Sequence, residues 1–138
     1  MISSIKLITR VSFLLLALFS VVSCDKDEEI VLSPTGEILA GTWVYEGYAN
    51  DVYEYSRANQ LDHDRAGFIF HTNGKLTNRQ NNSFCGTGPI VYENYKGSWN
   101  TEADSLVQIH SKYWGGDIDF KLEIVSVSTD KLLVRYDY

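Results

Sequence analysis

The stretch AGFIFHTNGKLTNR, residues 66–79, is the clearest indication of the fold. Phe68 and Phe70 alternate with other residues, as expected of a strand that buries one face. Asn73-Gly74 follows, and this pair is the strongest two-residue signal for a β-hairpin. Residues 75–80 then form the return strand. We therefore predict a hairpin here with a type I′ turn, in which Asn73 and Gly74 both have positive φ.

The same period of two extends outward in both directions. On the N-terminal side, GTWVYEGYA (residues 41–49) places Trp43 and Tyr45 on one face. On the C-terminal side, further strands are predicted over residues 90–99, 105–114, 118–128 and 131–138. The chain is therefore predicted to be all-β, with seven or eight short antiparallel strands and mostly sequential pairing.

Residues 50–66 do not alternate cleanly. Three interpretations stay open for this stretch: a helix of one or two turns, a long loop beside the mouth of a barrel, or a poorly formed pair of strands.

The N-terminal segment has the layout of a secretory signal. Lys6 and Arg10 precede an apolar run over residues 11–22, which is shorter than a membrane-spanning helix requires. Val21-Val22-Ser23-Cys24 resembles the lipobox of bacterial lipoproteins. The resemblance implies that residues 1–23 are a cleaved lipoprotein signal peptide and that Cys24 carries lipid, which anchors the protein to the membrane. The alternative is an ordinary signal peptide with a chance cysteine.

Residues 24–38 are predicted to be the lipid anchor and a flexible acidic tether, followed by one β domain over residues 39–138. Asp25-Lys26-Asp27-Glu28-Glu29 cannot pack into a core. This run also resembles the export tag that directs some Gram-negative lipoproteins to the outer face of the outer membrane. We therefore expect a lipid-anchored protein of the outer membrane, exposed at the cell surface; a plain solvated tether is the alternative.

The charge and the cysteine content of the chain limit which partners and cross-links it can have. Residues 1–23 contain two basic and no acidic residues, so their removal leaves 115 of the 138 residues and changes the formal charge from −6 to −8. An acidic domain without a basic patch is a poor nucleic-acid binder, so no nucleic-acid partner is expected. With Cys24 acylated, Cys85 is the single remaining thiol and no intramolecular disulfide can form. Cys85 is either a half-buried small residue or a reactive thiol.

The β domain resembles the lipocalin-like domains of bacterial lipoproteins. Gly41-Thr42-Trp43 matches the Gly-x-Trp motif of lipocalins, FIFHTNGKLTNR matches the hairpin of the shorter lipocalin-like domains, and Gly97-Ser98-Trp99 begins a similar tail. The resemblance implies a small up-and-down barrel in which Trp43 closes the base and a late basic residue, Arg135, packs across it. A guanidinium over an indole is a favourable contact. The domain is shorter than a full lipocalin and lacks a clear second motif.

Aromatic residues are the main candidates for a site, since the chain has three Trp, nine Tyr and six Phe. They either line a pocket for an apolar or sugar-like ligand or form the core of a small β domain. The candidates are Trp43, Tyr45, Phe68, Phe70, Trp99, Tyr113, Trp114 and Phe120.

Asp62-His63-Asp64 is the most enzyme-like stretch, because carboxylates and an imidazole can bind a metal or transfer protons. Neighbours on a strand point to opposite faces, however, and His71 and His110 are distant in sequence. We therefore predict a solvated loop here, with no catalytic residue, metal or cofactor. The expected function is non-enzymatic: a lipocalin-like envelope protein that binds a small apolar ligand. Alternatives are an accessory lipoprotein that docks onto a larger envelope complex and, more remotely, a small hydrolase.

Overall fold

The computed structural model describes residues 34–82 and 88–138. Cys24, the signal segment and Cys85 lie outside the described residues. Within them the chain forms one short helix and eight strands. These are α2 (Pro34–Leu39), β1 (Gly41–Ala49), β2 (Val52–Ala58), β3 (Gly67–Phe70), β4 (Lys75–Asn81), β5 (Tyr92–Ala103), β6 (Leu106–Tyr113), β7 (Gly116–Val127) and β8 (Lys131–Asp137).

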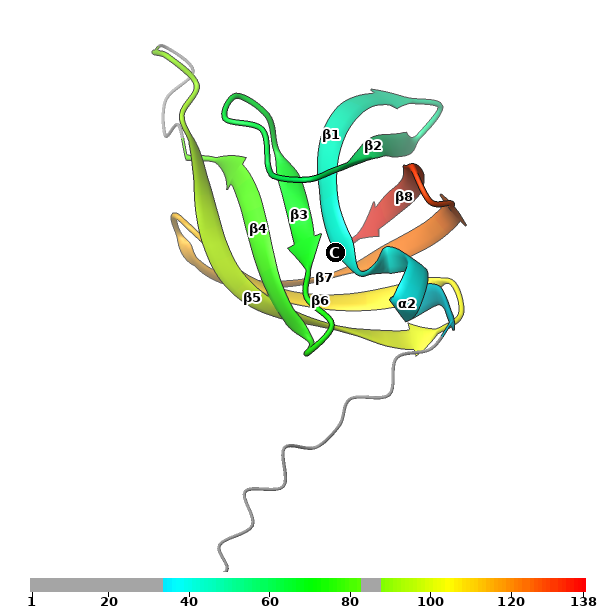
Figure 1. Ribbon diagram of the computed structural model, residues 1–138. Helices are drawn as coiled ribbons and strands as arrows, with labels where there is room; N and C mark the ends of the chain where they lie inside the picture. Colours follow the sequence, from blue (N-terminus) through cyan, green and yellow to red (C-terminus); the bar gives the residue numbers. More distant parts are fainter. Residues whose placement is uncertain (1–33, 83–87) are drawn as a thin grey trace, which may run out of the picture.

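The strands close into an antiparallel barrel, which confirms the predicted all-β class (Figure 1). The order around the barrel is β1-β2-β8-β7-β6-β5-β4-β3, with β3 paired back to β1. Most neighbours are consecutive in sequence. The exceptions are β1 with β3 and β2 with β8. A strictly sequential barrel would instead close by pairing its first and last strands, β1 and β8. Here β1 and β2 have exchanged places in the strand order, so that β2 pairs with β8 and β1 pairs with β3.

This arrangement explains the ambiguous stretch at residues 50–66. It forms the end of the β1–β2 turn, strand β2 and a connection that crosses the outside of β1 to reach β3 (Figure 1). Val44 lies between the inward-facing Trp43 and Tyr45, so its side chain is on the outer face of β1, yet it is buried. The crossing connection covers it: Leu61 lies near Val44 and against Gly67. No helix forms there.

The predicted β3–β4 hairpin exists, but its predicted turn type is wrong. Among its turn residues only Gly74 has positive φ (78°), whereas Asn73 does not. Gly74 N donates to His71 O (3.1 Å) and His71 N donates to Lys75 O (3.0 Å), which is the geometry of a type I turn followed by a left-handed glycine. Asn73 Oδ1 accepts a hydrogen bond from Lys75 N at 3.1 Å, which stabilises this turn.

The turn with two positive φ values is instead Asn50-Asp51, at 53° and 61°, between β1 and β2. Asn and Asp tolerate this conformation better than most residues with a Cβ.

Helix α2 lies across one end of the barrel (Figure 1). The sequence-based boundary at Leu39 is therefore five residues too late, because residues 34–38 belong to the helix and not to a flexible tether. Pro34 at its first position is favourable, since a helix's first N–H has no partner within the helix. Leu39 is fully buried and its carbonyl accepts a 2.7 Å hydrogen bond from Trp43 Nε1. This bond joins the helix to the barrel core.

Candidate functional site

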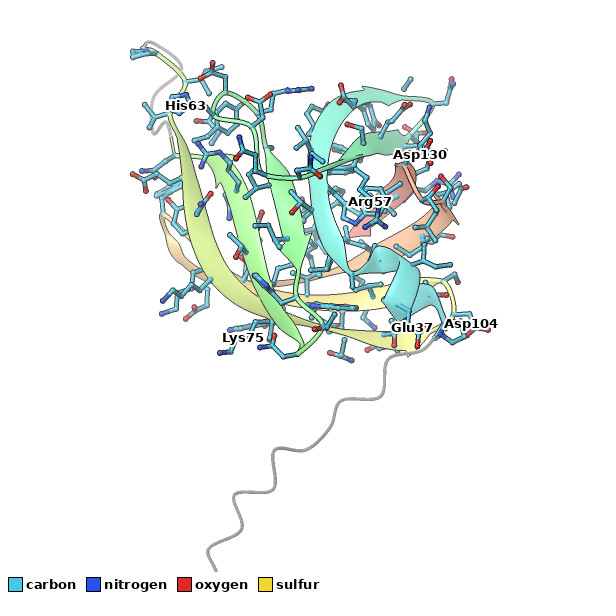
Figure 2. All side chains as sticks on the ribbon, viewed as in Figure 1. Glu37, Arg57, His63, Lys75, Asp104 and Asp130 are labelled. Carbon is cyan, nitrogen blue, oxygen red and sulfur yellow. The ribbon has the colours of Figure 1, made fainter. Side chains whose placement is uncertain are left out.

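The barrel end under α2 is plugged by Trp43 and Arg57. Trp43 has no exposed surface, and the Arg57 guanidinium lies over its ring at 4.1 Å from the centroid. Arg57 Nη1 donates to Ala40 O (2.9 Å), and its other nitrogens donate to the carbonyls of Ile38 and Thr129. Figure 2 shows Arg57 between α2 and the turn that carries Asp130. One side chain thus ties α2, β1 and the β7–β8 turn together.

The predicted pairing of Trp43 with Arg135 is wrong. In β8 the inward positions are Leu132, Val134 and Tyr136, so Arg135 faces outward, where its Nη1 lies 3.4 Å from a Glu123 carboxylate oxygen. Arg57 is directly opposite Trp43 in the β1–β2 register and therefore shares its inward face. The sequence signal is the alternation of Tyr53, Tyr55 and Arg57, which by itself does not decide between the three interpretations that stay open for residues 50–66.

The glycine of the Gly-x-Trp motif has a steric role. Gly41 has φ of 132°, a conformation that residues with a side chain rarely adopt. A Cβ on Gly41 would lie 2.4 Å from Arg57 Nη1. Glycine at this position therefore leaves room for the guanidinium against the backbone of β1.

The opposite end of the barrel contains a cavity of about 310 Å³. Three predicted aromatic residues line it: Tyr45, Phe68 and Phe120. Four further tyrosines, which the sequence did not single out, also line the cavity: Tyr53, Tyr55, Tyr136 and Tyr138. The lining residues lie at the β1–β2 turn end of their strands, away from α2. The cavity and the Trp43–Arg57 plug therefore occupy opposite ends of one barrel.

The other predicted aromatic residues do not line this cavity. Trp43, Phe70 and Trp99 are buried core residues, with Phe70 and Trp99 packed edge to face at 5.3 Å. Tyr113 is half-buried and packs edge to face against the exposed Trp114 at 5.7 Å, where β6 turns into β7. Some of the predicted aromatic residues thus form the core of the β domain, and others line a pocket.

Two tyrosines meet inside the cavity wall. The hydroxyls of Tyr55 and Tyr136 are 2.6 Å apart and hydrogen-bonded. Burial raises the pKa of Tyr55 and of Tyr136 well above the ordinary value for a phenol, so both are neutral at any physiological pH. The Tyr136 and Phe120 rings stack on one another with their centroids 5.4 Å apart, so this wall is aromatic.

A polar wall faces the tyrosines. Asn78 and Gln80 of β4 line the cavity, and β4 is diametrically opposite β8 in the strand order. Asn78 Nδ2 donates to Ser111 Oγ (3.1 Å), and Ser111 Oγ donates to Lys112 O (3.0 Å). Gln80 Nε2 donates to the same carbonyl (3.0 Å). Asn78 is 7% exposed and Ser111 is fully buried.

Asp62-His63-Asp64 does not form a catalytic constellation. His63 and Asp64 are almost fully exposed, 2.7 Å apart. Asp62 accepts from Asp64 N and pairs with Arg65 at 2.7 Å, and these contacts lower the pKa of Asp62. Arg65 also reaches Glu46 of β1 at 2.9 Å. The stretch therefore fastens the crossing connection to the barrel, and His63 lies far from the plugged end (Figure 2).

Within residues 34–82 and 88–138, no three His, Cys, Asp or Glu residues are grouped closely enough to hold a metal ion. In the same part of the chain, no helix has the length and apolarity needed to cross a membrane. Comparison of the chain with protein-family models, curated proteins and solved structures gave no match. The fold and the cavity therefore carry the functional argument.

Proposed function

We propose that this chain is a non-enzymatic, lipid-anchored, lipocalin-like protein of the outer envelope that binds a small, mainly apolar ligand inside its barrel. The observation that carries the proposal is the aromatic cavity of about 310 Å³ in a barrel whose other end is plugged. Ligand pockets are typically of this size, mostly apolar, with a few placed polar groups. Eight-stranded barrels have room to enclose one small ligand.

The proposed anchor supports an orientation. The chain enters the barrel through α2, at the plugged end. A lipid on Cys24 would therefore hold the plugged end nearer to the membrane and leave the cavity mouth toward the aqueous side. Ligand would then enter from water and not directly from the bilayer.

Binding is tested with 1-aminoanthracene, an uncharged dye that becomes fluorescent in apolar surroundings. Wild-type protein is expected to bind the dye saturably. Ile118→Trp, which enlarges a side chain of β7 that lines the cavity, is expected to weaken binding at least tenfold. Val125→Trp enlarges an exposed residue of the same strand and should leave binding unchanged. Absence of saturable binding, or equal loss in both variants, would contradict ligand binding in the cavity.

The anchor is tested separately by metabolic labelling with a fatty acid in a Gram-negative host. Wild-type protein is expected to carry label and to be processed before Cys24. Cys24→Ala is expected to stay unlabelled and uncut. Replacing the acidic residues of 25–29 by alanine and digesting intact cells with protease then tests whether that run directs surface display. A labelled Cys24→Ala species would remove the lipoprotein proposal while leaving the ligand-binding proposal intact.

A further inference from the structure

The direction of the Asn78 side-chain amide follows from its neighbours. Ser111 has one hydroxyl proton, and it is donated to Lys112 O. Toward Asn78 the Ser111 oxygen must therefore accept, so Nδ2 and not Oδ1 faces Ser111. Asn78 pairs with the inward-facing Phe68 in the β3–β4 register and lines the cavity. Its Oδ1 and its second N–H have no partner in the described part of the chain.

The tyrosine wall has an unused donor as well. Tyr55 and Tyr136 share one hydrogen bond but carry two hydroxyl protons. Whichever hydroxyl accepts, its own proton has no acceptor among residues 34–82 and 88–138. A buried donor without an acceptor is unfavourable, and a ligand acceptor would relieve that cost. The cavity thus offers hydrogen bonds from two opposite walls, β4 and the β2–β8 pair, among aromatic side chains.

Among the described residues, the lining offers no free cation to an anion. Asp51, Asp117 and Asp137 lie at the strand ends that surround the cavity, together with Lys112, which is opposite Asp117 in the β6–β7 register; all four are exposed. Arg79 is the one basic residue of the lining. Its guanidinium is directed to the outer wall, where Nη1 donates to the exposed Asn94 and Nη2 donates to His63 O. Inside the cavity, a ligand anion would therefore lose its hydration without gaining a cation.

From these three observations we propose that the cavity selects an uncharged, planar ring compound whose edge carries a hydrogen-bond donor beside an acceptor, as in a lactam. The side-chain amide of Asn78 has the complementary acceptor and donor, in the way that an Asn amide pairs with the edge of adenine. Tyr136 and Phe120 belong to the lining, and aromatic rings pack against a planar ring compound by offset stacking or edge to face. The inference rests on the proposed ligand-binding function and specifies the ligand class.

Four small probes of similar shape test the selection by isothermal titration or ligand-observed NMR: 2-quinolinone, N-methyl-2-quinolinone, naphthalene and 1-naphthoate. 2-Quinolinone is a neutral lactam, and its N-methyl analogue has lost the donor. Wild-type protein is expected to bind 2-quinolinone at least tenfold more tightly than the N-methyl analogue or naphthalene, and to bind 1-naphthoate most weakly. This comparison needs no variant, so it stands even if a substitution prevents folding.

Asn78→Leu is expected to remove the preference for 2-quinolinone while naphthalene still binds. Gln108→Leu is the matched control, because Gln108 is an amide on the outer wall of β6 that does not line the cavity, and it should keep the preference. Equal affinities for 2-quinolinone and naphthalene, or a preference that survives Asn78→Leu, would overturn this inference and leave the proposed function standing. If neither these probes nor 1-aminoanthracene bind, both proposals fail.

Discussion

Replacement of Arg57 by alanine is expected to lower the free energy of unfolding by about 2–4 kcal/mol. The contact with the buried Trp43 ring contributes about 0.5–2 kcal/mol. Hydrogen bonds from a charged donor contribute about 1.5–3 kcal/mol each when they are well shielded. Arg57 donates to three carbonyls but is only partly buried, so water replaces part of what is lost. The sum is a large share of the roughly 5–15 kcal/mol that stabilises a small domain.

Arg135→Ala is the matched control, since it removes an arginine from the same barrel. The Arg135 side chain is 46% exposed and its nearest contact is Glu123 at 3.4 Å. Exposed pairs of this kind contribute about 0–1 kcal/mol. Urea unfolding of both variants, followed by the fluorescence of the buried Trp43 and Trp99, gives the comparison directly.

A double-mutant cycle of Arg57→Ala with Trp43→Leu then isolates the ring contact, for which we expect a coupling energy of about 0.5–2 kcal/mol. Equal losses for Arg57→Ala and Arg135→Ala would refute the assignment of Arg57 as the plug. Additive losses in the cycle would show that the guanidinium and the indole do not interact.

Three further predictions concern the backbone and the tyrosines. Gly41→Ala is expected to lower the free energy of unfolding by about 1–3 kcal/mol, because φ is 132° and the new Cβ meets Arg57. In the Arg57→Ala background the loss should be smaller, because only the backbone strain remains. Thermal unfolding of the two single variants and the double variant checks this. Gly74→Val is expected to cost about 1–3 kcal/mol because φ is 78°, and a wild-type melting curve would contradict the turn assignment. Burial raises the pKa of Tyr55 and Tyr136 in the folded state. Their contribution to stability is therefore complete below the unfolded-state pKa of about 10 and is lost as the pH rises above that value. Ultraviolet titration should show both tyrosines ionising only on unfolding, and their ionisation in the intact fold would count against their burial.

Local pattern was sufficient for the elements of the barrel. Alternation predicted the inward position of Trp43, Phe68 and Phe70, and Asn73-Gly74 correctly located a hairpin although its turn type differed. Alternation does not identify strand β2, because its inward residues, Tyr53, Tyr55 and Arg57, are not a conventional apolar set. A period of two is visible in sequence only when the two faces differ in polarity.

The site depended on contacts between distant segments. Tyr55 and Tyr136 are 81 residues apart in sequence, yet their hydroxyls share a hydrogen bond. Asn78 and Ser111 are separated by 33 residues, and only their contact fixes which way the amide points. No local pattern contains this information, because it arises from how each strand registers with its neighbours.

By itself, the sequence determined the all-β class, the approximate number of strands and the burial of Trp43, because period two and turn chemistry act over a few residues. The tertiary structure alone decided that β2 and not β1 meets β8, that Arg57 and not Arg135 covers Trp43, and that one end of the barrel is filled while the other holds a cavity. Alternation determines which face of a strand is buried. The partner that meets that face is determined only when the barrel closes.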